Sequence, residues 1–166
     1  MSKPREKGST VVEFSLVGIP MLFLLVSIVE MARGMWTYHT LSHAVKEGTR
    51  FAMVHGENCT TAPNNCTVTL GQVAQRIRQA GVALDANLLS LTFTTPAGST
   101  TCLLRDCLTR PQTWPPAAGN AFGADIEISG VYPFQSAIAM FWPGAGSGVR
   151  VGSVNLPAAS REKIQF

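Results

Sequence analysis

The chain has 166 residues, of which 46% are hydrophobic and 14% are charged, a composition that suits one ordinary domain and excludes a long disordered tail. Thirteen Lys and Arg against ten Asp and Glu give a formal net charge of +3. This is well short of the clustered basic surface that nucleic-acid binding requires, so we expect no nucleic-acid partner. The mean hydropathy of +0.18 is high for a soluble protein, because the apolar residues are concentrated near the N-terminus.

The apolar residues form one run near the start of the chain. Residues 9–29, STVVEFSLVGIPMLFLLVSIV, contain one ionisable side chain, Glu13, and about 20 apolar residues suffice to cross the hydrocarbon core of a bilayer. The preceding leader, MSKPREKG, carries three basic residues and one acid, so the positive-inside rule places the N-terminus in the cytoplasm. No small-x-small cleavage site follows the run. The pattern therefore predicts a retained transmembrane helix over residues 9–30.

The leader, residues 1–8, ends in Gly8, and Glu13 and Phe14 follow inside the apolar run. This arrangement resembles prepilin leaders, which a membrane aspartyl peptidase cuts after glycine on the cytoplasmic face, leaving glutamate at the fifth mature position. The resemblance implies cleavage between Gly8 and Ser9. The residues alone also fit a capping box of Thr10 and Glu13, in which the carboxylate satisfies an amide at the helix start. A carboxylate within the membrane is costly, which favours a functional role in assembly.

Three further segments narrow the resemblance to one family. VEF at 12–14, VEMAR at 29–33 and KEGTR at 46–50 are similar to the pattern of TadE-like minor pilins (pseudopilins) of Tad systems, the tight adherence or Flp-type pilus. The matching family positions are Glu30, Arg33, Glu47, Gly48 and Arg50. The resemblance covers residues 8–54.

The resemblance implies a protein that acts in assembly or initiation of a Tad pilus, and thereby in adhesion and surface attachment. It implies a single-pass protein of the bacterial inner membrane, with a cytoplasmic N-terminus and a periplasmic head, which joins the pilus after processing. The implied partners are other Tad minor pilins (TadF-like and TadG-like), the major Flp pilin, the prepilin peptidase, the inner-membrane assembly platform and membrane lipid.

Beyond the membrane, the helix is expected to continue over residues 31–55. Small and apolar residues recur there at three- and four-residue spacing, namely Leu41, Ala44, Val45, Gly48, Phe51, Ala52 and His55. Glycine costs about 1 kcal/mol relative to alanine in a helix, so Gly48 on this face predicts close approach by another backbone. Pro20 predicts a kink in the membrane-spanning part, because it interrupts the hydrogen bonds of the helix.

His39, His43 and Glu47 fall at i, i+4 and i+8, a spacing that is compatible with metal binding. No fourth ligand is indicated, and a solvated polar face with a Glu47 to Arg50 pair explains these residues more simply. We therefore expect no metal site.

Residues 56–166 are expected to form the exported head. Thr69 and Gln72 predict a capping box at the start of a short helix that ends at Gly81. Apolar alternation predicts strands near 89–94 and 125–134, and a third strand that begins near 149–151 with Gly152 as a bulge. The stretch 96–123 is expected to be long and irregular. The predicted fold class is α+β, a long N-terminal transmembrane helix (a pilin-like spine) packed against a small antiparallel β-sheet head with a short extra helix.

All four cysteines lie on the exported side of the predicted helix, where thiols can oxidise. They are Cys59, Cys66, Cys102 and Cys107. Local disulfides 59–66 and 102–107 are the simplest of three possible connectivities, and zinc is the alternative, although neither spacing is Cys-x-x-Cys. A further apolar cluster, 140–143, is interpreted as core or lid, with a partner or the membrane surface as the alternative contact.

No nucleophile–base pair, phosphate-binding glycine loop or paired acids are present in the sequence. We therefore expect neither catalysis nor a cofactor. The alternative function is a bitopic, membrane-anchored periplasmic binding module with an uncleaved anchor, for which Gly8 and Glu13 would be incidental. A membrane-tethered enzyme is a third class, and it would need catalytic groups that the sequence does not reveal.

Overall fold

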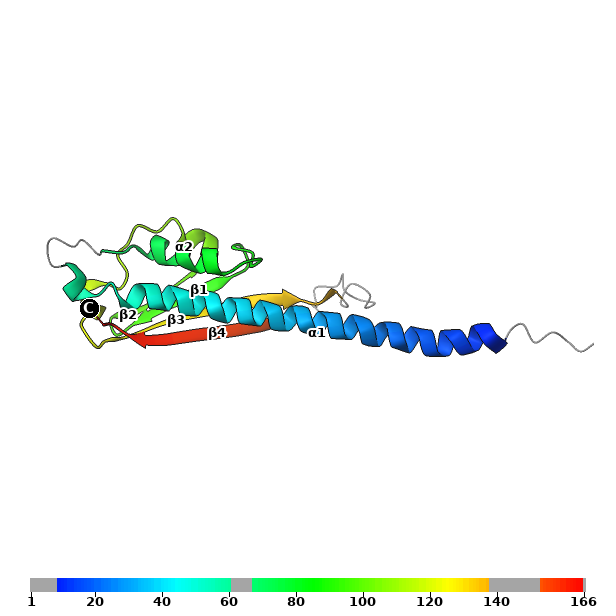
Figure 1. Cartoon of the computed structure of the whole chain (residues 1–166). Coiled ribbons are helices and arrows are strands. Elements are labelled where there is room, and N and C mark those ends of the chain that lie inside the picture. The colour runs from blue at the N-terminus through cyan, green and yellow to red at the C-terminus, as the bar shows by residue number, and fades with distance from the viewer. Residues whose placement is uncertain (1–8, 61–66, 138–152, 166) are drawn as a thin grey trace, which may run out of the picture.

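The structure is a computed structural model that describes residues 9–60, 67–137 and 153–165. Its elements in chain order are α1 (Ser9–Met53), η1 (Glu57–Thr60), α2 (Leu70–Ala80), β1 (Ser90–Thr95), β2 (Gly98–Leu103), α3 (Leu104–Cys107), η2 (Ala117–Gly119), β3 (Asp125–Gln135) and β4 (Ser153–Lys163). A long helix projects from a small head that contains a four-stranded sheet (Figure 1). The predicted α+β fold is confirmed.

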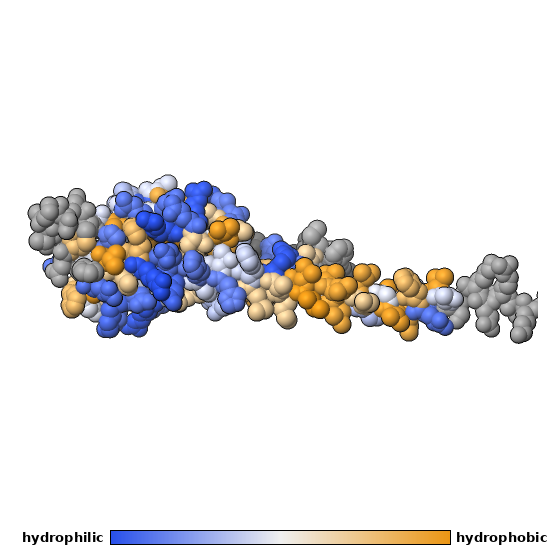
Figure 2. Space-filling view, in the orientation of Figure 1, coloured by the Kyte–Doolittle hydropathy of each residue, from blue (hydrophilic) through white to orange (hydrophobic). Residues whose placement is uncertain are grey.

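α1 has 45 residues, which gives a length of about 67 Å at 1.5 Å per residue. Its first half lies outside the head, and its second half packs against the sheet and α2 (Figure 1). From Val11 to Val29 the large apolar side chains are 44–77% exposed, and hydrophobic residues cover most of the visible surface of this part of the helix (Figure 2). This part of the helix is long and apolar enough to cross a membrane, as a single-pass membrane protein requires.

The ends of α1 differ slightly from those expected. The helix already includes Ser9, so Thr10 lies inside it rather than at its N-cap, and the capping-box interpretation of Thr10 and Glu13 is wrong. At the other end the helix stops at Met53, two residues before His55. The helix continues through Pro20, and the kink at this position stays a prediction.

α2 begins and ends where the sequence predicts. The Thr69 hydroxyl accepts a hydrogen bond from the Gln72 backbone N–H at 3.2 Å, and the Gln72 side chain accepts one from the Thr69 N–H at 2.9 Å. Each side chain thereby satisfies an amide that the helix leaves without a partner. The Gly81 N–H donates to the Ile77 carbonyl at 2.8 Å at the C-terminal end. The buried face of α2 consists of Leu70, Gly71, Val73, Ala74 and Ile77.

The sheet has the order β2-β1-β3-β4, and all neighbouring strands are antiparallel. The register places Leu91 opposite Gly130 and Phe93 opposite Ile128, so these residues share one face of the sheet. That face carries the buried apolar side chains and packs on α1. The packing is close, because a Cβ added to Gly130 would lie 3.2 Å from the Val45 side chain. The core therefore lies between the sheet and the second half of α1.

β2 is an element that the sequence analysis missed. The stretch 96–123, expected to be irregular, contains β2, α3 and η2. β2 is an edge strand in which only Cys102 is buried, so its sequence lacks the apolar alternation that marks a half-buried strand. It is held by pairing with β1, including contact between the Thr92 and Thr101 hydroxyls at 3.0 Å.

β4 also differs from its prediction, because the expected start at 149–151 and the bulge at Gly152 lie outside the described residues. The strand spans Ser153–Lys163 and pairs with β3 along its whole length. Where β4 ends, Arg161 donates a hydrogen bond to Asp125 of β3 at 3.0 Å, and the Lys163 ammonium lies 3.6 Å from the other carboxylate oxygen. The hydrogen bond from Arg161 and the charges of Arg161 and Lys163 lower the pKa of Asp125, and partial desolvation opposes them.

This lowered pKa predicts a pH-dependent contribution to stability. The Asp125 carboxylate stabilises the fold above its ordinary pKa of 3.8, and this contribution is lost as the pH falls through the lower pKa of the folded state. The midpoint of urea unfolding of Asp125→Asn is therefore expected to lie at a slightly lower urea concentration than that of the wild type at pH 7. At about pH 2 the two midpoints are expected to be nearly equal. Urea midpoints at both pH values test this, and a difference that is equal at both would contradict it.

Candidate functional site at the membrane exit of the helix

Glu30 connects the apolar part of α1 to the sheet. It is only 9% exposed, although the helix around it is open to solvent or lipid. One carboxylate oxygen accepts a hydrogen bond from Arg33 one turn further on, and the other accepts the backbone N–H of Ala137 at 3.0 Å. Ala137 follows the end of β3, so Glu30 joins segments that lie 107 positions apart in the chain. The carboxylate thus holds the end of β3 against the helix.

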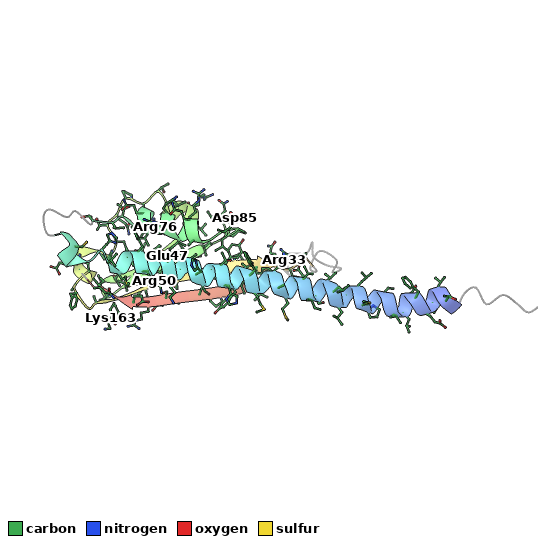
Figure 3. The ribbon with its side chains drawn as sticks, in the orientation of Figure 1. Arg33, Glu47, Arg50, Arg76, Asp85 and Lys163 are labelled. Carbon is green, nitrogen blue, oxygen red and sulfur yellow. A yellow bond between two sulfur atoms is a disulfide. The ribbon has the colours of Figure 1, made fainter. Side chains whose placement is uncertain are left out.

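Arg33 lies beside this link and faces the sheet. Its guanidinium carbon lies 5.6 Å from the centroid of the Phe134 ring, within the range of a cation–π interaction. The side chain is 52% exposed, so the hydrogen bond to Glu30 leaves N–H donors of the guanidinium open to solvent. Figure 3 shows Arg33 where the far end of β3 meets α1.

A groove of about 700 Å³ lies at the same place. Its lining includes Val29, Arg33 and Trp36 from α1, and Tyr132 and Phe134 from β3. Trp36 is 68% exposed, whereas Tyr132 and Phe134 are half-buried. The groove therefore combines one cationic side chain with aromatic walls, and the sequence analysis gave no sign of it because β3 and α1 are distant in the chain.

The remaining family positions lie further along α1. Glu47 and Arg50 are exposed (Figure 3), and the predicted pair between them is not among the ion pairs of the described residues. Gly48 is buried, but a Cβ at this position would overlap the Ile77 side chain of α2, with Cδ1 at 2.8 Å. The predicted approach of another backbone is therefore wrong, since the close neighbour of Gly48 is a side chain.

The remaining predicted site residues, apart from the cysteines, belong to α1 or lie outside the described part of the chain. His39 and His43 are exposed on α1, and no group of three or more His, Cys, Asp or Glu able to hold a metal occurs within the described ranges. Gly8 and the apolar cluster 140–143 lie outside the described residues. Glu13 and Phe14 lie in the first turns of α1, where the Phe14 ring is 77% exposed.

The disulfide predicted between Cys102 and Cys107 is confirmed, with the two Cα atoms 5.6 Å apart. It joins the end of β2 to α3, and the zinc alternative is wrong for these two residues because their sulfurs are bonded to each other. Cys59 is also disulfide-bonded, whereas Cys66, its predicted partner, lies outside the described residues.

The long exposed apolar helix, followed by a compact α+β head, fits a single-pass membrane protein. Residues 8–50 match the sequence model of the TadE-like protein family. The matched range begins at Gly8 and includes Glu30, Arg33 and the segment 46–50, so the resemblance to TadE-like proteins is confirmed over this part of the chain. No curated protein and no solved structure matches the chain significantly.

Proposed function

We propose that the protein is a minor pilin of a Tad pilus, cut after Gly8 by a prepilin peptidase and active in assembly or initiation of the fibre. The observation that carries the proposal is the match of residues 8–50 to the TadE-like family. The role is one of assembly and adhesion, without catalysis. Its partners are other Tad minor pilins, the major Flp pilin and the assembly platform of the inner membrane, with the N-terminus in the cytoplasm and the head in the periplasm.

The start of the helix supports this proposal. Ser9, the residue after the proposed scissile bond, is helical, and the apolar segment follows it directly. Cleavage creates a new ammonium at Ser9, and Glu13 lies about 6 Å further along the helix axis. Pairing of these two charges lowers the cost of holding each of them in a bilayer.

Intact mass is the measurement that tests the proposal. In membranes that contain the cognate prepilin peptidase, the chain is expected to lose residues 1–8, which leaves ten basic and nine acidic residues and a net charge of +1. Gly8→Ala is expected to keep the full length, because the peptidase cuts after glycine. Membranes without the peptidase should contain only the full-length chain.

Gly18→Ala is the matched control, since it makes the same substitution ten residues later and the added methyl meets only the Phe14 ring, at 3.7 Å. This variant is expected to be cut like the wild type. A full-length chain in membranes with and without the peptidase would contradict the minor pilin proposal. It would favour a membrane-anchored binding module with a permanent anchor.

A further inference from the structure

The groove beside Arg33 lies at the depth of lipid headgroups. A hydrocarbon core of about 30 Å takes up about 20 helical residues, so an apolar segment that enters the core at Thr10 leaves it near Val29. Arg33 then lies about 6 Å beyond the core, and Trp36 about 10 Å beyond it. The headgroup layer on each side is about 5–7 Å thick. The groove therefore spans the layer in which phosphates and glycerol groups reside.

The side chains of the groove suit an amphipathic ligand of this layer. Arg33 is the single charged residue among the described residues that line the groove. Glu30 and the Phe134 ring fix its position, while the exposed half of the side chain leaves N–H donors for an anion. Trp36 and Tyr132 provide flat apolar walls with polar N–H and O–H groups, the combination that is enriched at membrane interfaces.

The groove is also continuous with the surface that faces lipid. Val29 belongs both to the apolar segment and to the groove, and it is 59% exposed. An acyl chain lying along this side of α1 can thus extend from the bilayer directly into the groove.

We infer that this groove binds a phospholipid of the leaflet from which α1 emerges beneath the head. The phosphate accepts hydrogen bonds from the Arg33 guanidinium, the glycerol region lies against Trp36 and Tyr132, and one acyl chain runs along Val29 into the bilayer. An anionic headgroup is preferred, because it adds attraction to the charge of Arg33. The lipid thereby fixes how deep the head sits over the membrane.

Retention of lipid by the full-length protein tests this inference. The protein is reconstituted in vesicles of phosphatidylcholine with a minor fraction of phosphatidylglycerol and extracted in mild detergent, and native mass spectrometry then counts the lipids that remain bound. The wild type is expected to retain one phospholipid, enriched in phosphatidylglycerol. Arg33→Gln is expected to lower this retention about fivefold, because a charge-assisted hydrogen bond is lost.

Arg76→Gln is the matched control. Arg76 is an exposed arginine of α2 whose guanidinium carbon lies 4.8 Å from the centroid of the Phe51 ring, so it has the same chemistry as Arg33 on the far part of the head (Figure 3). This control should retain lipid like the wild type. Phe134→Leu provides a second test, since it keeps the pair of Glu30 and Arg33 but removes an aromatic wall, and it is also expected to lower retention.

Two results would overturn the inference. One is equal lipid retention by Arg33→Gln, Phe134→Leu and the Arg76→Gln control, which would show that the lipid is held without the groove. The other is efficient crosslinking between Trp36→Cys chains in the same vesicles without retained lipid, which would show that a second copy fills the groove. The inference requires α1 to span the membrane but does not require cleavage after Gly8. The lipid-retention experiment can therefore refute the lipid site without refuting cleavage, and the mass experiment can refute cleavage without refuting the lipid site.

Discussion

Gly48→Val is expected to lower the free energy of unfolding of the head by about 3 kcal/mol, since overpacking a filled core forces side chains and backbone to move. The first added carbon would overlap the Ile77 side chain and lie 3.6 Å from Ile128. Gly48, Ile77 and Ile128 are all buried, so no open space can accommodate the new methyl groups. Urea unfolding, followed by the fluorescence of the buried Trp114, measures the loss.

A double variant, Gly48→Val with Ile77→Ala, tests whether crowding against Ile77 causes the loss of stability in Gly48→Val. Ile77→Ala alone is expected to cost about 3 kcal/mol through the cavity it leaves. Combined with Gly48→Val, it removes the overlapping atoms, so the double variant should be more stable than the sum of the two single effects. Glu47→Ala, on the exposed side of the same turn, is the control and should change stability by less than about 0.5 kcal/mol. Strictly additive effects of Gly48→Val and Ile77→Ala would refute the crowding explanation.

Glu30→Gln is expected to release the end of β3 from α1. The neutral side chain cannot pair with the Arg33 charge, and it offers the Ala137 N–H a weaker acceptor than a carboxylate. Hydrogen exchange at the Ala137 amide is therefore expected to accelerate more than tenfold, because the bond that protects it opens more often. Exchange in the paired centre of β3, at Ile128, should stay as in the wild type.

Glu47→Gln serves as the control for this prediction. It removes the same charge from the same helix, but at an exposed position. Its exchange rates in β3 should equal those of the wild type. Unchanged exchange at Ala137 in Glu30→Gln would mean that the end of β3 is held by other contacts.

The elements that the sequence predicted correctly are those specified by local pattern. α2 follows from the capping residues Thr69 and Gln72 and from the glycine at its end. β1 and β3 follow from period-two alternation, which a strand with one buried face requires. The membrane-spanning part of α1 follows from length and hydropathy alone.

The features that the sequence did not predict depend on contacts between distant segments. β2 is specified by its register against β1 rather than by its own apolar residues. The sequence also could not show which group packs against Gly48. A glycine on the packed face of a helix predicts a close contact, but it does not indicate whether the partner is a backbone or a side chain. The hydrogen bond from the Ala137 backbone to Glu30 has no sequence signal beyond an acid beside the apolar run, and the groove depends on this same long-range placement of β3.

β3 and β4 run alongside α1 rather than across it (Figure 1), and this geometry determines how the molecule bears mechanical load. A pull on the membrane end of the helix is directed nearly along the interface between α1 and the sheet. The packing around Val45 and Gly130 is then loaded in shear, with many contacts strained together instead of being peeled apart one by one. Tension along the helix axis is thus shared across the whole interface between α1 and the sheet.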